Sequence, residues 1–136
     1  MTLPITALTA AICAIMLLIT AIDTVRQRIK GSVAFGDGGG DHPKLVSAMR
    51  SHANLAEHAP IVILMIGVLE SAHAHHWALT AIATTFLAGR ALHIIGLYAP
   101  VNAKPPLPRS LGVILTWVTM AALIGWILVM VVTRNG

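Results

Sequence analysis

The chain has 136 residues, of which 57% are hydrophobic and only 10% are charged, and its formal net charge at pH 7 is +4. This length allows one domain at most, and the composition excludes an ordinary water-soluble globular protein. The basic residues flank apolar segments, where they orient membrane helices, so the positive charge does not indicate nucleic-acid binding.

Four apolar segments are long enough to cross a membrane, which takes about 20 helical residues. The first and fourth contain long uncharged runs, whereas the second and third carry charged side chains within an apolar background. We therefore predict an all-α integral membrane protein in which a single domain, 1–136, forms a four-helix bundle. The predicted spans are 3–25, 43–71, 77–98 and 110–132.

The first span differs from a secretory signal, because no positive region precedes it and its apolar stretch is longer than a signal core. We expect it to remain in the protein. Cys13 follows Ile12, whereas a lipoprotein site needs a small residue there, and a lone cysteine supports no disulfide framework. We interpret the Cys13 thiol as a helix-packing group.

Small residues four apart recur on the outer spans, and such rows let helices approach closely in lipid. The rows are Thr6, Ala10 and Ala14 on the first span and Ala121 and Gly125 on the fourth. The alternative is that alanine and glycine are simply common in membrane helices.

The segment 31–42 is rich in glycine and should be a mobile loop, after which Asp41 or His42 caps a helix that has Pro43 in its first turn. Four prolines within 99–109 forbid a continuous helix there and should end the third span near Tyr98.

Lysine and arginine are unevenly distributed between the two ends of the predicted bundle. One end carries six of them, whereas the other carries Arg134. Because short cytoplasmic loops are enriched in positive charge, we expect both termini on the non-cytoplasmic side of a bacterial inner membrane. The six are Arg26, Arg28, Lys30 and Lys44 after the first span, and Lys104 and Arg109 after the third.

The second predicted span carries a polar stripe. At 100° per residue, Arg50, Asn54 and Glu57 fall within about 60° of one another, while His52 points nearly opposite. A charge at the bilayer centre costs about 2.5 to 3.5 kcal/mol, so such residues face a bundle interior or a polar cavity. The stripe therefore predicts a polar pocket toward the cytoplasmic side.

The third predicted span adds Arg90 and His93, which share a helix face, and Arg26 lies just beyond the cytoplasmic end of the first span. Arginines bind planar carboxylates through two parallel hydrogen bonds, whereas Glu57 and Asn54 can accept from an ammonium or amide group. A small zwitterionic peptide would match this set. The alternative is that Arg50 and Glu57 pair with Arg90 across helices and simply lock the bundle.

The motif Arg50-x-His52-x-Asn54-x-x-Glu57, followed by Pro60, resembles the second-helix signature of the MAPEG family, the membrane-associated proteins in eicosanoid and glutathione metabolism. The likeness is greatest to its microsomal glutathione transferases and prostaglandin E synthases. Two further matches are Arg90-x-x-His93, which resembles the third-helix motif, and Pro108-Arg109-Ser110, which resembles the start of the fourth helix. The number, lengths and order of the spans agree as well.

This resemblance implies a homotrimer that binds glutathione between neighbouring subunits, open to the cytoplasm. It also implies that Arg50, Asn54 and Glu57 hold the carboxylate and amino ends of the peptide. Further residues expected to contact or support the site are Arg26, His52, Arg90, His93 and Tyr98. Arg109 matches the arginine that stabilises the glutathione thiolate, and Ser110 matches the neighbouring hydroxyl. Arg109 could instead be a positive-inside anchor.

Two histidine features are assigned no catalytic role. Glu70 and His73 have a spacing found at carboxylate metal sites, with His75 and His76 nearby, but one copy of that spacing does not make a site. We expect a solvated loop and no metal. His58 is interpreted as a hydrogen-bonded histidine at a helix interface.

The resulting hypothesis is a glutathione-binding membrane transferase that activates the thiolate for attack on a lipophilic electrophile entering from membrane lipid. Peroxidase and isomerase activity stay open alongside transferase activity. Two alternatives are a non-catalytic scaffold for lipophilic ligands and a structural subunit whose polar stripe pairs with a partner helix.

Overall fold

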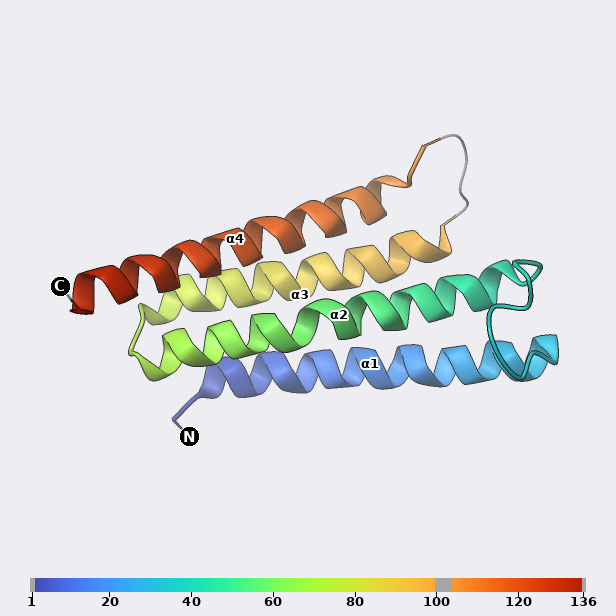
Figure 1. The fold of residues 1–136 in the computed structure, drawn as a ribbon, viewed down its shortest axis with the longest axis horizontal. Coiled ribbons are helices and arrows are strands. Elements are labelled where there is room, and N and C mark those ends of the chain that lie inside the picture. The colour runs from blue at the N-terminus through green and yellow to red at the C-terminus, as the bar shows by residue number, and fades with distance from the viewer. Residues whose placement is uncertain (1, 100–103, 136) are drawn as a thin grey trace.

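The computed structural model describes residues 2–99 and 104–135, which fold into four long helices. Successive helices run in opposite directions, so the two termini lie at one end of the molecule (Figure 1). All four are long and apolar enough to cross a membrane, which confirms the predicted all-α membrane architecture. The helices are α1 (Pro4–Gly31), α2 (Pro43–Ser71), α3 (His76–Tyr98) and α4 (Leu107–Asn135).

The helices pack in chain order, with α1 on α2, α2 on α3 and α3 on α4 (Figure 1). Lesser contacts join α1 to α3 and α2 to α4, and among the described residues α1 and α4 do not meet. The two central helices therefore supply most of the core, whereas α1 and α4 present many large apolar side chains outward, as lipid-facing helices do. Buried core residues include Leu55, Ile66, Leu69, Leu79 and Phe86.

The first helix continues beyond its apolar stretch. Helix α1 runs to Gly31 and ends where Ser32 adopts a left-handed conformation with φ 53°, its N–H bonded to the carbonyls of Arg28 and Ile29. No proline or glycine interrupts the chain between Pro4 and Gly31, so nothing stops the helix earlier. Arg26 therefore lies on α1 rather than in the loop where the sequence pattern put it.

The start of α2 corrects the predicted cap. His42 occupies the position before the helix and Pro43 is its first residue, but no side chain caps this end by a hydrogen bond. The His42 ring instead lies against Gly31, where a Cβ atom would come within 2.9 Å of its Nδ1. At the same end of the bundle, α3 stops at Tyr98, as the proline content of the following segment predicts.

Glu70 near the end of α2 caps the start of α1. Its carboxylate accepts hydrogen bonds from the Ile5 N–H at 2.8 Å, the Thr6 N–H at 2.8 Å and the Thr6 hydroxyl at 2.6 Å. A helix leaves its first N–H groups without intrahelical partners, and a carboxylate is well suited to them. Glu70 is thus a structural residue, and no metal-binding group of three or more histidine, cysteine or acidic residues occurs in 2–99 and 104–135.

Glycines bring α3 and α4 into close contact. A Cβ atom on Gly112 would lie 2.6 Å from both the Gly89 carbonyl oxygen and the His93 nitrogen, and one on Gly96 would overlap the backbone of Arg109. By contrast, Gly125 is exposed and a Cβ atom there would meet nothing within 4 Å. The close approach predicted for the small residues of the fourth span therefore occurs nearer the start of α4, at different residues.

Candidate functional site

The buried guanidinium of Arg90 organises the polar interior. Arg90 is only 2% exposed and donates through Nη1 to Asn54 Oδ1 on α2, at 2.6 Å. Through Nη2 it donates to the Gly112 carbonyl oxygen at 3.2 Å and to the Thr116 hydroxyl oxygen, both on α4. Its carbon Cζ lies 5.9 Å from the centroid of the Phe86 ring, within cation–π range. One side chain thus links three helices.

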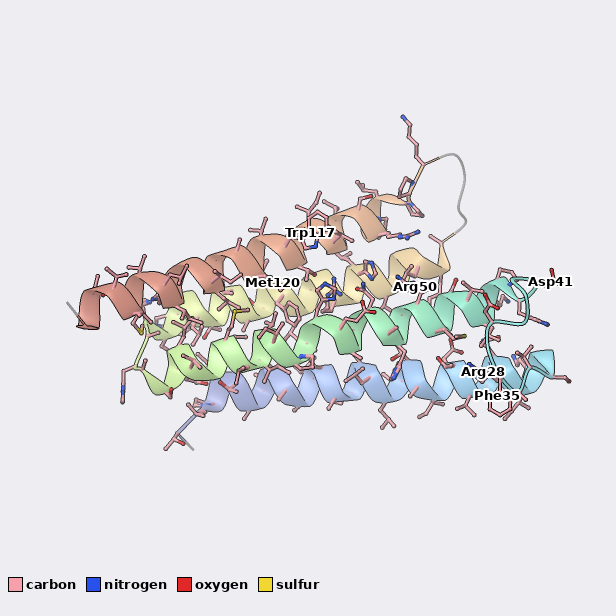
Figure 2. The ribbon with its side chains drawn as sticks, in the orientation of Figure 1. Arg28, Phe35, Asp41, Arg50, Trp117 and Met120 are labelled. Atoms are coloured by element: carbon pink, nitrogen blue, oxygen red, sulfur yellow. The ribbon has the colours of Figure 1, made fainter. Side chains whose placement is uncertain are left out.

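These contacts contradict the alternative in which Arg50 and Glu57 pair with Arg90 to lock the bundle. The hydrogen-bond partners of Arg90 are an amide, a hydroxyl and a backbone carbonyl, not the carboxylate of Glu57. The reason is geometric, because Asn54 lies between Arg50 and Glu57 on the stripe and is the stripe residue that faces α3. Arg50 and Glu57 are exposed. Figure 2 shows Arg50 in the half of the bundle that contains the α1–α2 loop.

A small cavity of about 180 Å³ adjoins this network, between α2, α3 and α4. In it, His58 Nδ1 lies 2.8 Å from the Asn54 carbonyl oxygen. Since a carbonyl only accepts, the His58 Nδ1 carries a proton and donates it to this hydrogen bond. Thus His58 is hydrogen-bonded at a helix interface, as predicted. The cavity is lined by Asn54, His58, Arg90, Val113, Thr116 and Trp117.

His52 lies apart from the Arg90 network. Its Nδ1 shares a hydrogen bond of 3.1 Å with the hydroxyl of Thr20 on α1. Asn54, two residues later, faces α3, which confirms that the two side chains point in opposite directions. Within one chain, His52 therefore supports the α1–α2 interface rather than the surroundings of Arg90.

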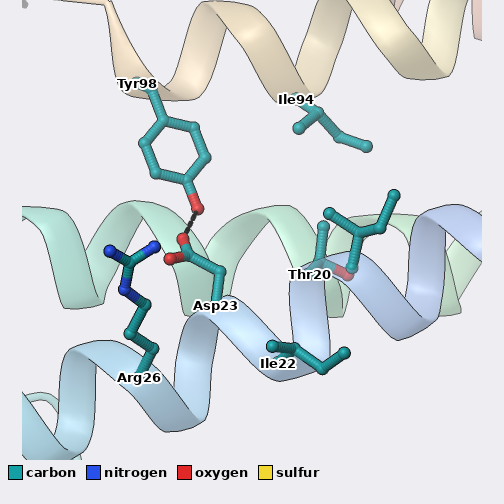
Figure 3. Close-up of a pocket in the computed structure, with 7 residues that line it drawn as sticks. Thr20, Ile22, Asp23, Arg26, Ile94 and Tyr98 are labelled. Atoms are coloured by element: carbon teal, nitrogen blue, oxygen red, sulfur yellow. Dashed lines mark hydrogen bonds between the residues drawn. The ribbon is translucent and has the colours of Figure 1, made fainter.

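A larger pocket of about 410 Å³ lies between α1 and α3, where the Tyr98 hydroxyl donates a hydrogen bond to Asp23 Oδ2 (Figure 3). Arg26, three residues after Asp23, lines the same pocket, and isoleucines form its apolar walls. Because the phenol proton of Tyr98 is committed to Asp23, only the lone pairs of its oxygen remain for a ligand. Tyr98 and Arg26 thus lie together, away from Asn54 and Arg90.

Asp23 is a site residue that the sequence pattern does not single out. One sequence feature could have identified it, because Asp23 is an acidic residue directly after the uncharged run that ends at Ile22 and three positions before Arg26. Its second carboxylate oxygen accepts from the Gln27 amide at 3.0 Å. Asp23 therefore makes an intrahelical contact and a contact to α3 at the same time.

Arg109, Ser110 and His93 lie where α3 and α4 meet. The N–H groups of Arg109 and Ser110 bond the Pro106 carbonyl oxygen at 3.0 and 3.2 Å, which forms the first turn of α4. Gly96 allows the backbone of Arg109 to pack directly on α3, and both Arg109 and Ser110 are half-buried. His93 is 6% exposed and lies against Gly112. These three residues surround the same end of the α3–α4 interface.

Comparison with known proteins identifies the family. The sequence model of the MAPEG family matches residues 6–129, which is most of the chain. The chain belongs to the MAPEG family. This confirms the resemblance to that family.

This MAPEG chain is also similar to the inner membrane protein YecN of Escherichia coli strain K12. The two are 36% identical over 94 residues, which cover 69% of this chain and 70% of YecN. The protein of the same name from Escherichia coli O6:H1, strain CFT073, shows the same identity and coverage. No solved structure matches the chain.

Proposed function

We propose that this MAPEG protein binds glutathione and activates its thiolate for attack on a lipophilic electrophile in the inner membrane. The proposal rests on the hydrogen bonding and exposure of the polar stripe on α2. Asn54 is held by Arg90, whereas Arg50 and Glu57, on the same face, remain exposed within a membrane-spanning helix. Charges at that depth need a polar partner, because lipid provides none.

The chemistry of the exposed groups fits a zwitterionic tripeptide with two carboxylates and one ammonium group. Guanidinium groups at Arg50 and Arg26 suit carboxylates, since each offers parallel N–H donors. The Glu57 carboxylate suits the ammonium. Hydrogen bonds to charged groups contribute about 1.5 to 3 kcal/mol each, so a few such contacts account for useful affinity.

Assembly of three chains would complete the site. Arg26 and Tyr98 lie at the α1–α3 pocket, apart from Asn54 and Arg90, so one chain does not bring all the expected ligand contacts together. A neighbouring chain can supply the missing side, as the family resemblance implies. The exposed Arg50 and Glu57 would then face a subunit boundary rather than lipid.

Arg109 is the residue we assign to thiolate stabilisation, with Ser110 beside it. Glutathione supplies the thiol, and its thiolate form is the nucleophile. A fixed guanidinium favours the negative sulfur electrostatically, especially where lipid and protein exclude water. The packing of the first turn of α4 on Gly96 supports this assignment, because it fixes the Arg109 backbone against α3.

Glutathione binding tests the proposal directly. Calorimetry of the purified protein in detergent should detect glutathione binding, and Arg50→Ala and Glu57→Ala should each weaken it by about tenfold or more, the equivalent of one lost charged hydrogen bond. The matched control is Lys44→Ala, an exposed cation on another face of α2, which should bind like the wild type.

Equal affinity in wild type, Arg50→Ala and Glu57→Ala would contradict the assignment of the stripe. Binding of a lipophilic ligand without glutathione would instead support a non-catalytic scaffold. Copurification of a different membrane protein at fixed stoichiometry, without glutathione binding, would support a structural subunit.

A further inference from the structure

The Arg90 network is directional, because each of its members has a fixed set of donors and acceptors. An arginine side chain only donates, so the atom of Asn54 that faces Arg90 must be its carbonyl oxygen. The bond is short, at 2.6 Å, and Arg90 is 2% exposed. The hydrogen bond to Arg90 therefore decides which of the two amide atoms of Asn54 is the oxygen and which is the nitrogen.

The orientation of Asn54 has a consequence for recognition. In a planar amide whose oxygen points to Arg90, the NH₂ group points away from it. Asn54 then offers two N–H donors to a ligand, whereas the sequence pattern predicts that it accepts from an ammonium or amide group. The group recognised by the Asn54 NH₂ is a hydrogen-bond acceptor, such as a carboxylate or a peptide carbonyl.

Thr116 on α4 anchors the other end of this network. Its hydroxyl donates to the Gly112 carbonyl oxygen at 2.8 Å, which leaves its lone pairs to accept from Arg90 Nη2. Thr116 is 1% exposed, so little of it contacts bulk solvent. The close packing of Gly112 on Gly89 and His93 fixes Thr116 relative to α3. The polar chain therefore runs from α4 through α3 to α2.

A second observation also indicates an acceptor in this region. Arg90 Nε is buried and has no hydrogen-bond partner within the described residues. A buried unpaired donor on a charged group is costly. Both Arg90 and Asn54 line the cavity of about 180 Å³, which is large enough for a carboxylate group.

We infer that Thr116 is a positioning residue that holds Arg90 and thereby presents the Asn54 NH₂ group to a carboxylate or carbonyl oxygen of the bound peptide. The inference rests on the proposed function, since it assigns a part of the glutathione molecule to this site. Glu57, one turn further along the same face, then receives the ammonium group. Asn54 and Glu57 discriminate between the two ends of a zwitterion.

The test uses isosteric variants of the full-length protein in detergent. Thr116→Val removes the hydroxyl and should weaken glutathione binding by about tenfold, whereas Thr116→Ser restores the hydroxyl and should recover most of the affinity. Asn54→Asp keeps an acceptor for Arg90 but removes the outward donor. It should also lose about tenfold in affinity while its thermal unfolding temperature stays close to that of the wild type.

A measurement on the ligand-free protein tests the positioning role of Thr116 separately from glutathione binding. Nitrogen-15 NMR detects the guanidinium N–H signals of Arg90, which are assigned by their loss in Arg90→Lys. These N–H groups should be protected from hydrogen exchange in the wild type and in Thr116→Ser. In Thr116→Val they should exchange rapidly. Unchanged protection in Thr116→Val would overturn the positioning role.

The binding results separate the two proposals. Wild-type binding with equal affinity in Asn54→Asp would overturn the inference and leave the proposed function intact. No binding by the wild type would overturn the proposed function and the ligand assignment together.

Discussion

Arg90 and Arg109 lie on adjacent helices but differ in their surroundings. Arg90 is buried and its hydrogen bonds are to neutral groups of the protein itself, so its charge serves organisation of the interior. Arg109 is half-buried on the first turn of α4. A thiolate partner therefore suits Arg109 better than Arg90.

Arg109→Ala should separate binding from activation. We expect glutathione affinity to change little, because other residues hold its ends, while the thiolate absorbance of the complex falls by about tenfold at neutral pH. Ultraviolet difference spectroscopy measures the thiolate directly. Lys104→Ala is the control, since it removes an exposed cation from the same end of the bundle and should leave the thiolate signal unchanged. Equal loss in both variants would show that Arg109 acts only as an anchor.

The α3–α4 pair is the element on which the polar interior depends. Glycines at 89, 96 and 112 remove side chains where the two helices cross, and this close approach lets Thr116 and the Gly112 carbonyl reach Arg90. On the opposite side of α3, α2 contributes Asn54. A change in the spacing of α3 and α4 would therefore alter the site as well as the packing.

Gly112→Ala should destabilise the protein by about 1 to 3 kcal/mol, because its Cβ atom would lie 2.6 Å from backbone atoms of α3 that cannot move independently. The matched control on the same helix is Gly125→Ala, where a Cβ atom meets nothing within 4 Å. That variant should be neutral or up to about 1 kcal/mol more stable, since alanine favours helix. Thermal unfolding in detergent compares the two. Similar melting temperatures would show that the helices do not pack as closely as described.

Across the whole molecule, the bundle is open rather than closed. Helices α1 and α4 do not meet among the described residues, and the charged groups of Arg50 and Glu57 are exposed between apolar surfaces. At the bilayer centre each uncovered charge costs about 2.5 to 3.5 kcal/mol. This cost exceeds the free energy that a surface salt bridge contributes. Association with further copies would remove this cost.

We therefore predict that the protein forms a homotrimer in mild detergent. Native mass spectrometry should give an assembly of three 14.3 kDa chains. Replacing both stripe charges, as Arg50→Leu with Glu57→Leu, should weaken the assembly if those groups interact across the boundary. A single chain as the predominant wild-type species would contradict the trimer and leave the exposed charges facing detergent.

Local patterns were sufficient to predict four apolar helices, the polar face of α2 and the family signature. Hydropathy depends on neighbours along the chain, and a helix repeats every 3.6 residues, so Arg50, Asn54 and Glu57 align without any knowledge of packing. The proline-rich end of α3 could be predicted for the same reason.

The partners of these residues depend on how the helices are placed against one another. Arg90 bonds Asn54 and Thr116 rather than Glu57, Glu70 caps α1, and Tyr98 bonds Asp23. Each contact joins residues far apart in the chain. Its formation depends on how two helices are rotated about their axes and how far they are shifted along them. Those are set by side-chain packing at glycine contacts and core residues, which a periodic pattern does not encode.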